Sequence, residues 1–107
     1  MGKLVKLVRL NGLQFNANRD PQVYRRAVGE RFRIQALLDA GAGARCTLRD
    51  ARGQVTVATD VPAGGTFTHE LAFNTPGVHV VTLVAERDGQ SFTQDLRLDV
   101  LAHAWVG

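Results

Sequence analysis

Apolar and polar residues alternate along most of the chain with a period of two, which is typical of β-strands that bury one face. The clearest example is ERFRIQALLD (30–39), in which only Leu37 departs from the alternation. The last run, 91–100, is equally regular apart from Gln94. The residues that these two runs place on an inward face are Phe32, Ile34, Ala36, Leu38, Phe92, Leu96, Leu98 and Val100.

Shorter runs between these two predict further strands. The inward-facing residues that they predict are Cys46, Leu48, Val55, Val57, Phe67, His69, Leu71 and Phe73. Residues 78–85 are apolar on both faces, which is typical of a central strand covered on two sides. The sequence therefore predicts a series of short strands and almost no helix.

Turn residues separate the runs. DARG (50–53) and DVPAGG (60–65) predict loops, and NTPG (74–77) predicts a turn with Pro76 and Gly77 at its centre. Asp88-Gly89 predicts a hairpin between the last two strands. Asn11-Gly12 favours a hairpin, or a first strand broken by a bulge, near the start of the chain.

Strands spaced every 8–12 residues favour an antiparallel sandwich, because a single sheet would leave one apolar face in water. We expect an all-β fold of about seven to eight strands. A chain of 107 residues forms one domain, 1–107, large enough to bury a core without metals or disulfides. Residues 1–12 are interpreted as an edge strand or a docking segment.

The C-terminal third carries a family resemblance. NTPGVHVVTLVAERDGQSFTQDLRLDV (74–100) resembles the end of bacterial immunoglobulin-like and polycystic-kidney-disease (PKD)-type modules. The resemblance is clearest over residues 66–101, and VGERFRIQALLD is loosely similar to the second strand of such modules. The resemblance implies an immunoglobulin-like sandwich and a spacer or docking role. It also implies that His79 replaces the tyrosine that ties a corner of such domains to the backbone. The chain lacks the cysteine pair and buried tryptophan of antibody domains.

Charge is unevenly distributed along the chain. Residues 1–53 carry eleven Lys/Arg and four Asp/Glu, a net +7, whereas 54–107 carry two and six, a net −4; together they give +3. Either the two halves pair their charges across neighbouring strands, or a basic surface meets an acidic partner. Nucleic acid is disfavoured, because only Tyr24 and Phe32 lie among the arginines and no nucleic-acid-binding motif is present.

Residues with catalytic potential are few. Cys46 is the only cysteine, so there is no internal disulfide, and its alternation with Leu48 indicates a buried residue. His69 and His79 lack a third ligand for a metal, and ERDG (86–89) is explained by a turn without calcium. We therefore expect a non-catalytic protein with no cofactor and no metal.

The functions that remain are binding to a partner and assembly with other chains. The candidate partner contacts are Lys3, Lys6, Arg9, Arg25, Arg26 and Trp105, for each of which local packing or solvated charge is the alternative. The leading interpretation is a domain that docks onto a larger assembly, such as a phage virion decoration or tail component, with a protein partner or a second copy. The alternative is an accessory or spacer module of a secreted multidomain bacterial protein, with weak support for carbohydrate binding.

Location in the cell is left open by the sequence. No apolar run approaches the roughly 20 residues of a membrane helix, and MGKLVKLVRLNG lacks the pattern of a secretory signal. We expect assembly in the cytoplasm or in a virion if the chain is complete, and an extracellular location if it was excised from a larger protein.

Overall fold

The computed structural model describes residues 4–16, 24–41 and 43–102, which form nine β-strands and no α-helix. Seven strands have six residues or more, and two have only two. The strands are β1 (Val5–Leu10), β2 (Leu13–Gln14), β3 (Arg26–Ala27), β4 (Arg31–Leu38), β5 (Ala44–Arg49), β6 (Val55–Val61), β7 (Thr66–Ala72), β8 (Gly77–Arg87) and β9 (Gln90–Leu101). The all-β prediction is confirmed, with nine strands in place of about seven to eight.

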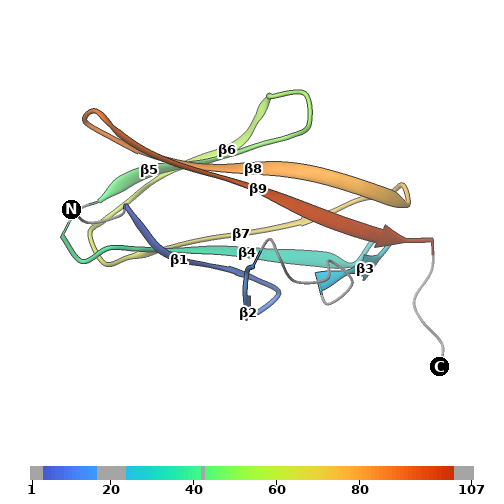
Figure 1. Ribbon diagram of the computed structural model, residues 1–107. Helices are drawn as coiled ribbons and strands as arrows, with labels where there is room; N and C mark the ends of the chain where they lie inside the picture. Colours follow the sequence, from blue (N-terminus) through green and yellow to red (C-terminus); the bar gives the residue numbers. More distant parts are fainter. Residues whose placement is uncertain (1–3, 17–23, 42, 103–107) are drawn as a thin grey trace.

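The strands form two sheets that face each other as a sandwich (Figure 1). One sheet has the order β2-β1-β4-β7, and the other has the order β3-β9-β8-β5-β6. All pairs are antiparallel except β3 and β9, which run parallel. The chain therefore crosses between the layers several times, and the two sheets share one core.

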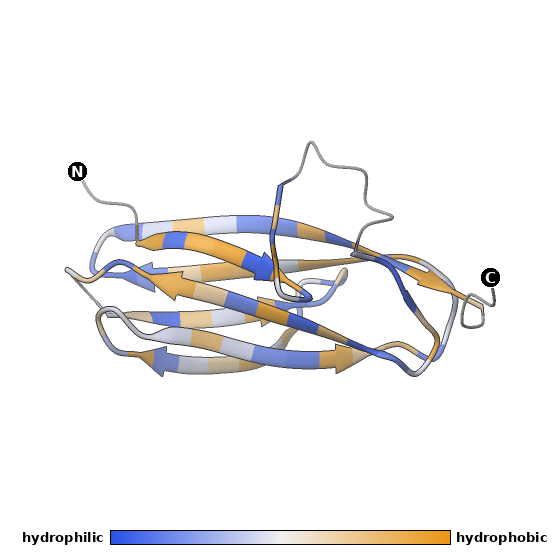
Figure 2. Cartoon of the chain, turned by 90° about the horizontal axis from the view of Figure 1, so that it is seen from below, coloured by the Kyte–Doolittle hydropathy of each residue, from blue (hydrophilic) through white to orange (hydrophobic). Residues whose placement is uncertain are grey.

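The core lies between the layers, where the inward faces of the strands meet. Apolar and polar residues alternate along the strands, as the colours of Figure 2 show. Phe32, Ile34 and Ala36 of β4 are fully buried, as the sequence predicts. Leu96 and Leu98 of β9, in the other sheet, belong to the same core cluster. Burying a leucine, isoleucine or phenylalanine side chain contributes about 1.5–3 kcal/mol, so these inner faces contribute strongly to stability.

The N-terminal hairpin is confirmed. Asn11 and Gly12 both have positive φ angles, 55° and 82°, as the two central residues of a type I′ turn require. The turn joins β1 to β2, and β1 also pairs with β4. Val5, Val8 and Leu10 are buried, so β1 is part of the sandwich.

Three details of the sequence prediction are wrong. Val78 and Val80 of β8 are 57% and 38% exposed, because no described element packs on the outer face of this sheet. Val55 is exposed while Val57 packs against the core, because the β5–β6 register shifts beside Arg49. Gly77 begins β8, with a φ of 121°, and is not a central residue of the preceding turn.

Candidate interaction surface

The outer face of the four-stranded sheet concentrates positive charge. Alternation along β4 buries Phe32 and Ile34 and turns Arg31 and Arg33 outward. Arg9 of β1 lies opposite Gln35 of β4 and is exposed on the same face. Lys6 is exposed close by, where the β1–β4 register shifts. We call the surface formed by Lys6, Arg9, Arg31 and Arg33 the basic face.

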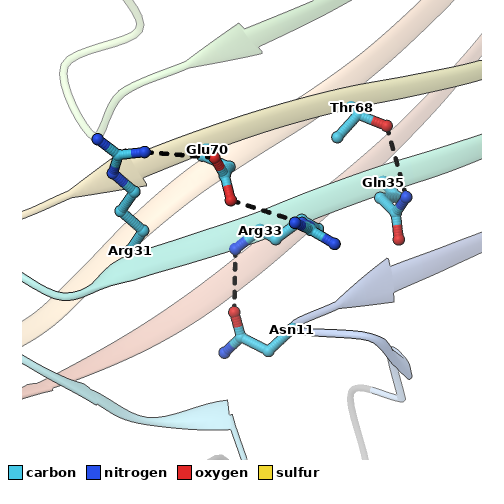
Figure 3. Close-up of polar contacts among 6 residues, drawn as sticks. All are labelled: Asn11, Arg31, Arg33, Gln35, Thr68 and Glu70. Carbon is cyan, nitrogen blue, oxygen red and sulfur yellow. Dashed lines mark hydrogen bonds and ion pairs between the residues drawn. The ribbon is translucent and has the colours of Figure 1, made fainter.

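One carboxylate partly balances this charge (Figure 3). Glu70 of β7 lies with Oε1 3.6 Å from Nη1 of Arg31 and Oε2 3.5 Å from Nε of Arg33. The three side chains are exposed to solvent, so these ion pairs contribute little to stability. Because one carboxylate is shared by two guanidinium groups, the basic face keeps a net positive charge.

Amide and hydroxyl groups continue the polar surface beside the arginines. Gln35 of β4 donates from Nε2 to Oγ1 of Thr68 on β7, at 3.5 Å (Figure 3). Both residues project outward between Arg9 and the β7 edge, since Gln35 pairs with Arg9 on one side and Thr68 on the other. The surface therefore presents hydrogen-bonding groups as well as charge.

Asn11 fixes the hairpin against the basic face. Its backbone N–H donates to the carbonyl of Arg33 at 2.8 Å, and its Oδ1 accepts from the N–H of Arg33 at 2.9 Å. The side-chain oxygen thus replaces a main-chain carbonyl in the ladder. Nδ2 donates to the carbonyl of Tyr24 at 2.7 Å. The sequence indicates the turn at Asn11 but not these side-chain contacts.

The structure brings only some of the sequence candidates together. Lys6 and Arg9 belong to the basic face, whereas Arg26 lies in β3 of the other sheet, where its Nη1 donates to the carbonyl of Arg25 at 3.0 Å. Lys3 and Trp105 lie outside the described residues, as does the third histidine of the chain, His103. Arg31, Arg33 and Glu70 were not singled out from the sequence, although the alternation in ERFR places both arginines outward.

The two described histidines have different surroundings. His69 of β7 is half-buried opposite Ile34 of β4. His79 of β8 stacks on Phe73, with ring centroids 4.0 Å apart and planes at 18°. Its Nε2 lies 2.9 Å from the carbonyl oxygen of Thr75, so a proton on Nε2 is donated there. Within the described ranges, no three potential ligands gather as a metal group.

Cys46 is fully buried between the sheets, as predicted. Burial disfavours the thiolate and raises the pKa of its thiol. A thiol in this state is a poor nucleophile, because the thiolate is the reactive form.

Comparisons with known proteins give no relative for this chain: no family model, no curated protein and no solved structure matches it significantly. Among the described residues there is also no helix of the length and apolar character needed to cross a membrane.

Proposed function

We propose that the chain is an immunoglobulin-like domain that docks, without catalysis, onto an acidic protein surface of a larger assembly. The strand order supports the fold assignment. Immunoglobulin domains place strands A, B and E in one sheet and C, F and G in the other, with C′ added in the variable type. In this proposal β1, β4 and β7 correspond to the first set, and β6, β5, β8 and β9, which are neighbours in that order, correspond to C′, C, F and G.

The corner before β8 gives independent support. In immunoglobulin domains a tyrosine near the start of strand F hydrogen-bonds to the backbone a few residues upstream. His79 is the third residue of β8 and donates to the carbonyl of Thr75, four residues upstream. The histidine thus makes the backbone contact that the family resemblance implies for this position.

The observation that carries the binding proposal is the charge of the basic face. Arg9, Arg31 and Arg33 project from paired strands, and Glu70 alone cannot neutralise them. Strands fix the positions of these cations, so little backbone entropy is lost when a partner binds. An acidic partner surface would gain both charge complementarity and fast association.

The chemistry of this face favours protein over single-stranded nucleic acid as the partner. Single-strand binders stack bases on exposed aromatic rings. The described aromatic side chains are buried or half-buried, and Tyr24, Phe32 and Phe67 are at most 2% exposed. Gln35 lies opposite Arg9, and Thr68 lies opposite Gln35; the amide and hydroxyl groups of these two residues can hydrogen-bond to carboxylates and backbone groups of a protein.

Binding of a fluorescein-labelled oligoglutamate peptide, followed by fluorescence anisotropy at low salt, tests the proposal. We expect the double variant Arg31→Gln/Arg33→Gln to weaken binding about tenfold, equivalent to about 1.4 kcal/mol. The matched control is the double variant Arg45→Gln/Arg49→Gln, which removes two exposed arginines from the other sheet and should leave the affinity unchanged.

Two results would overturn the proposal. One is equal loss of affinity in both variants, which would indicate non-specific attraction by net charge. The other is tighter binding of a single-stranded DNA oligonucleotide than of oligoglutamate, with a steep salt dependence, which would identify a nucleic-acid binder. Failure of the peptide to bind at all would favour the spacer interpretation.

A further inference from the structure

β7 presents an unusually regular open edge. It pairs with β4 over seven residues, from Arg31 opposite Ala72 to Leu37 opposite Thr66, with no register shift. Its other edge has no partner strand within the ranges that the structure describes. The strand TFTHELA contains no Pro, Lys or Arg, and its one acidic side chain, Glu70, is held by two arginines of β4.

The other sheet edges carry features that discourage pairing with another chain. Natural proteins protect edges with bulges, charges, Pro and short strands. The β5–β6 register shifts near Val55, and Pro62 follows the end of β6. β9 presents Asp95, Arg97 and Asp99, and β3 covers its end. β2 has only two residues, and the part of β1 that it leaves unpaired carries exposed Lys6 and a register shift. β7 is therefore the edge best suited to strand addition.

We propose that two copies of this chain pair through antiparallel β7 strands, with His69 opposite His69 of the second copy. A two-fold axis perpendicular to the sheet, relating the two copies, places the inner faces of both copies on one side of the joined sheet and their outer faces on the other. Because side chains alternate along a strand, only registers centred on a residue satisfy this condition. The three central candidates are Thr68, His69 and Glu70.

The register centred on His69 gives the best self-complementarity. It places Phe67 opposite Leu71 on the inner face and Thr68 opposite Glu70 on the outer face, each pair occurring twice. A threonine hydroxyl can donate to the facing carboxylate, and the apolar pair packs across the strands. Centring on Glu70 would oppose two like charges, and centring on Thr68 would set Phe67 against His69.

The burial of the inward side chains of β7 agrees with a second copy of the chain at this edge. Leu71 points inward but is only half-buried, whereas Phe67 on the same face is 2% exposed. Phe67 of a second copy would cover Leu71 in the proposed register. One strand pair buries less than the roughly 1,200–2,000 Å² of a stable complex, so the dimer is expected to be weak and reversible.

The dimer would also extend the basic face. Two four-stranded sheets would join into one of eight strands, with the arginines of both copies on the same side. Two linked binding surfaces raise the apparent affinity for a repetitive partner, as in an assembly with many identical subunits. This consequence rests on the proposed function; the dimer itself does not.

Sedimentation velocity over a concentration series tests the dimer with charges placed at Thr68, which is exposed. In the proposed register, residue 68 of each copy faces Glu70 of the other copy, so the contact occurs twice. We expect Thr68→Glu to raise the dimer dissociation constant about tenfold and Thr68→Lys to lower it about tenfold. Thr93→Glu and Thr93→Lys are the matched controls, because Thr93 is exposed on β9, and they should leave the dimer dissociation constant unchanged.

Opposite effects of Glu and Lys at one position cannot arise from misfolding, and unchanged thermal unfolding of each monomer checks this directly. The proposal is overturned if the wild type and Thr68→Lys both remain monomeric at all concentrations, which would leave the β7 edge to a strand of another protein. A dimer that is insensitive to charge at residue 68 would overturn it as well. Neither result bears on oligoglutamate binding by the monomer.

Discussion

His79 donates from Nε2 to the carbonyl oxygen of Thr75 at 2.9 Å while its ring stacks on Phe73 at 4.0 Å between centroids. Phe73 follows directly after β7, and His79 lies near the start of β8 in the other sheet. The two contacts therefore join the layers at the point where the chain crosses between them. The imidazole satisfies a carbonyl in a connection that otherwise has few backbone partners of its own.

Replacing His79 should loosen this corner measurably. We expect His79→Ala to lower the free energy of unfolding by about 1–3 kcal/mol, through the lost hydrogen bond and the lost stacking. His79→Phe keeps a stacked ring and should lose only about 1 kcal/mol. Urea unfolding followed by tryptophan fluorescence or circular dichroism measures both. Thr75→Val is the control, because it removes only the longer 3.5 Å contact of the Thr75 hydroxyl and keeps the 2.9 Å contact to the backbone. A loss there equal to that of His79→Ala would contradict this account.

Asn11 offers a second test, because its conformation and its side-chain contacts can be separated. Asn11→Gly keeps the positive φ angle but removes the bonds to Arg33 and Tyr24, and should cost about 1–3 kcal/mol. Asn11→Ala should cost about 1 kcal/mol more, because a Cβ disfavours φ near +55°. Thermal unfolding of the two variants in parallel gives the difference. Equal stability of Gly and Ala at this position would show that the turn relaxes.

Much of the fold follows from side-chain alternation alone. A strand such as β4 buries every second residue, so ERFRIQALL specifies both its core residues and its outward arginines. Asn11-Gly12 and Asp88-Gly89 specify hairpins because glycine, and less readily asparagine, adopts positive φ. These are local effects, and local sequence is sufficient to predict them.

The basic face could not be predicted in the same way, because it depends on which strands are neighbours. Glu70 meets Arg31 and Arg33 only because β7 pairs with β4. These two strands are far apart in the sequence: Gln35 and Thr68, which pair with each other, are separated by 33 positions. Strand order and register are set by packing of the whole core. The same limit explains the error at Val78: apolar residues on both faces of a strand do not show whether a second layer covers it.

The exposure of Val78 can be tested against its buried neighbour Val81. Both are β8 valines, but Val78 is 57% exposed and Val81 is 5% exposed. Val→Thr keeps the shape and adds a hydroxyl. We expect Val78→Thr to change the free energy of unfolding by no more than about 0.5 kcal/mol. Val81→Thr should cost about 1–3 kcal/mol, because its hydroxyl enters the core. Equal costs in urea unfolding would indicate that the outer face of β8 is covered in solution, as a bound partner would cover it.

Cys46 links stability to alkaline pH. Burial raises the pKa of its thiol, so the folded chain keeps the proton where the unfolded chain releases it. Its stabilising contribution is therefore complete below the unfolded thiol's pKa of about 8.5 and declines as the pH rises toward the raised value. In that window the free energy of unfolding should fall as the pH rises, by at most about 1.4 kcal/mol per pH unit, the limit for one proton. Unfolding free energies of the wild type and Cys46→Ala between neutral and alkaline pH isolate this slope, since all other titrating groups are shared. Parallel pH profiles, or rapid labelling of the native thiol by a thiol reagent, would mean that Cys46 is accessible in the folded state.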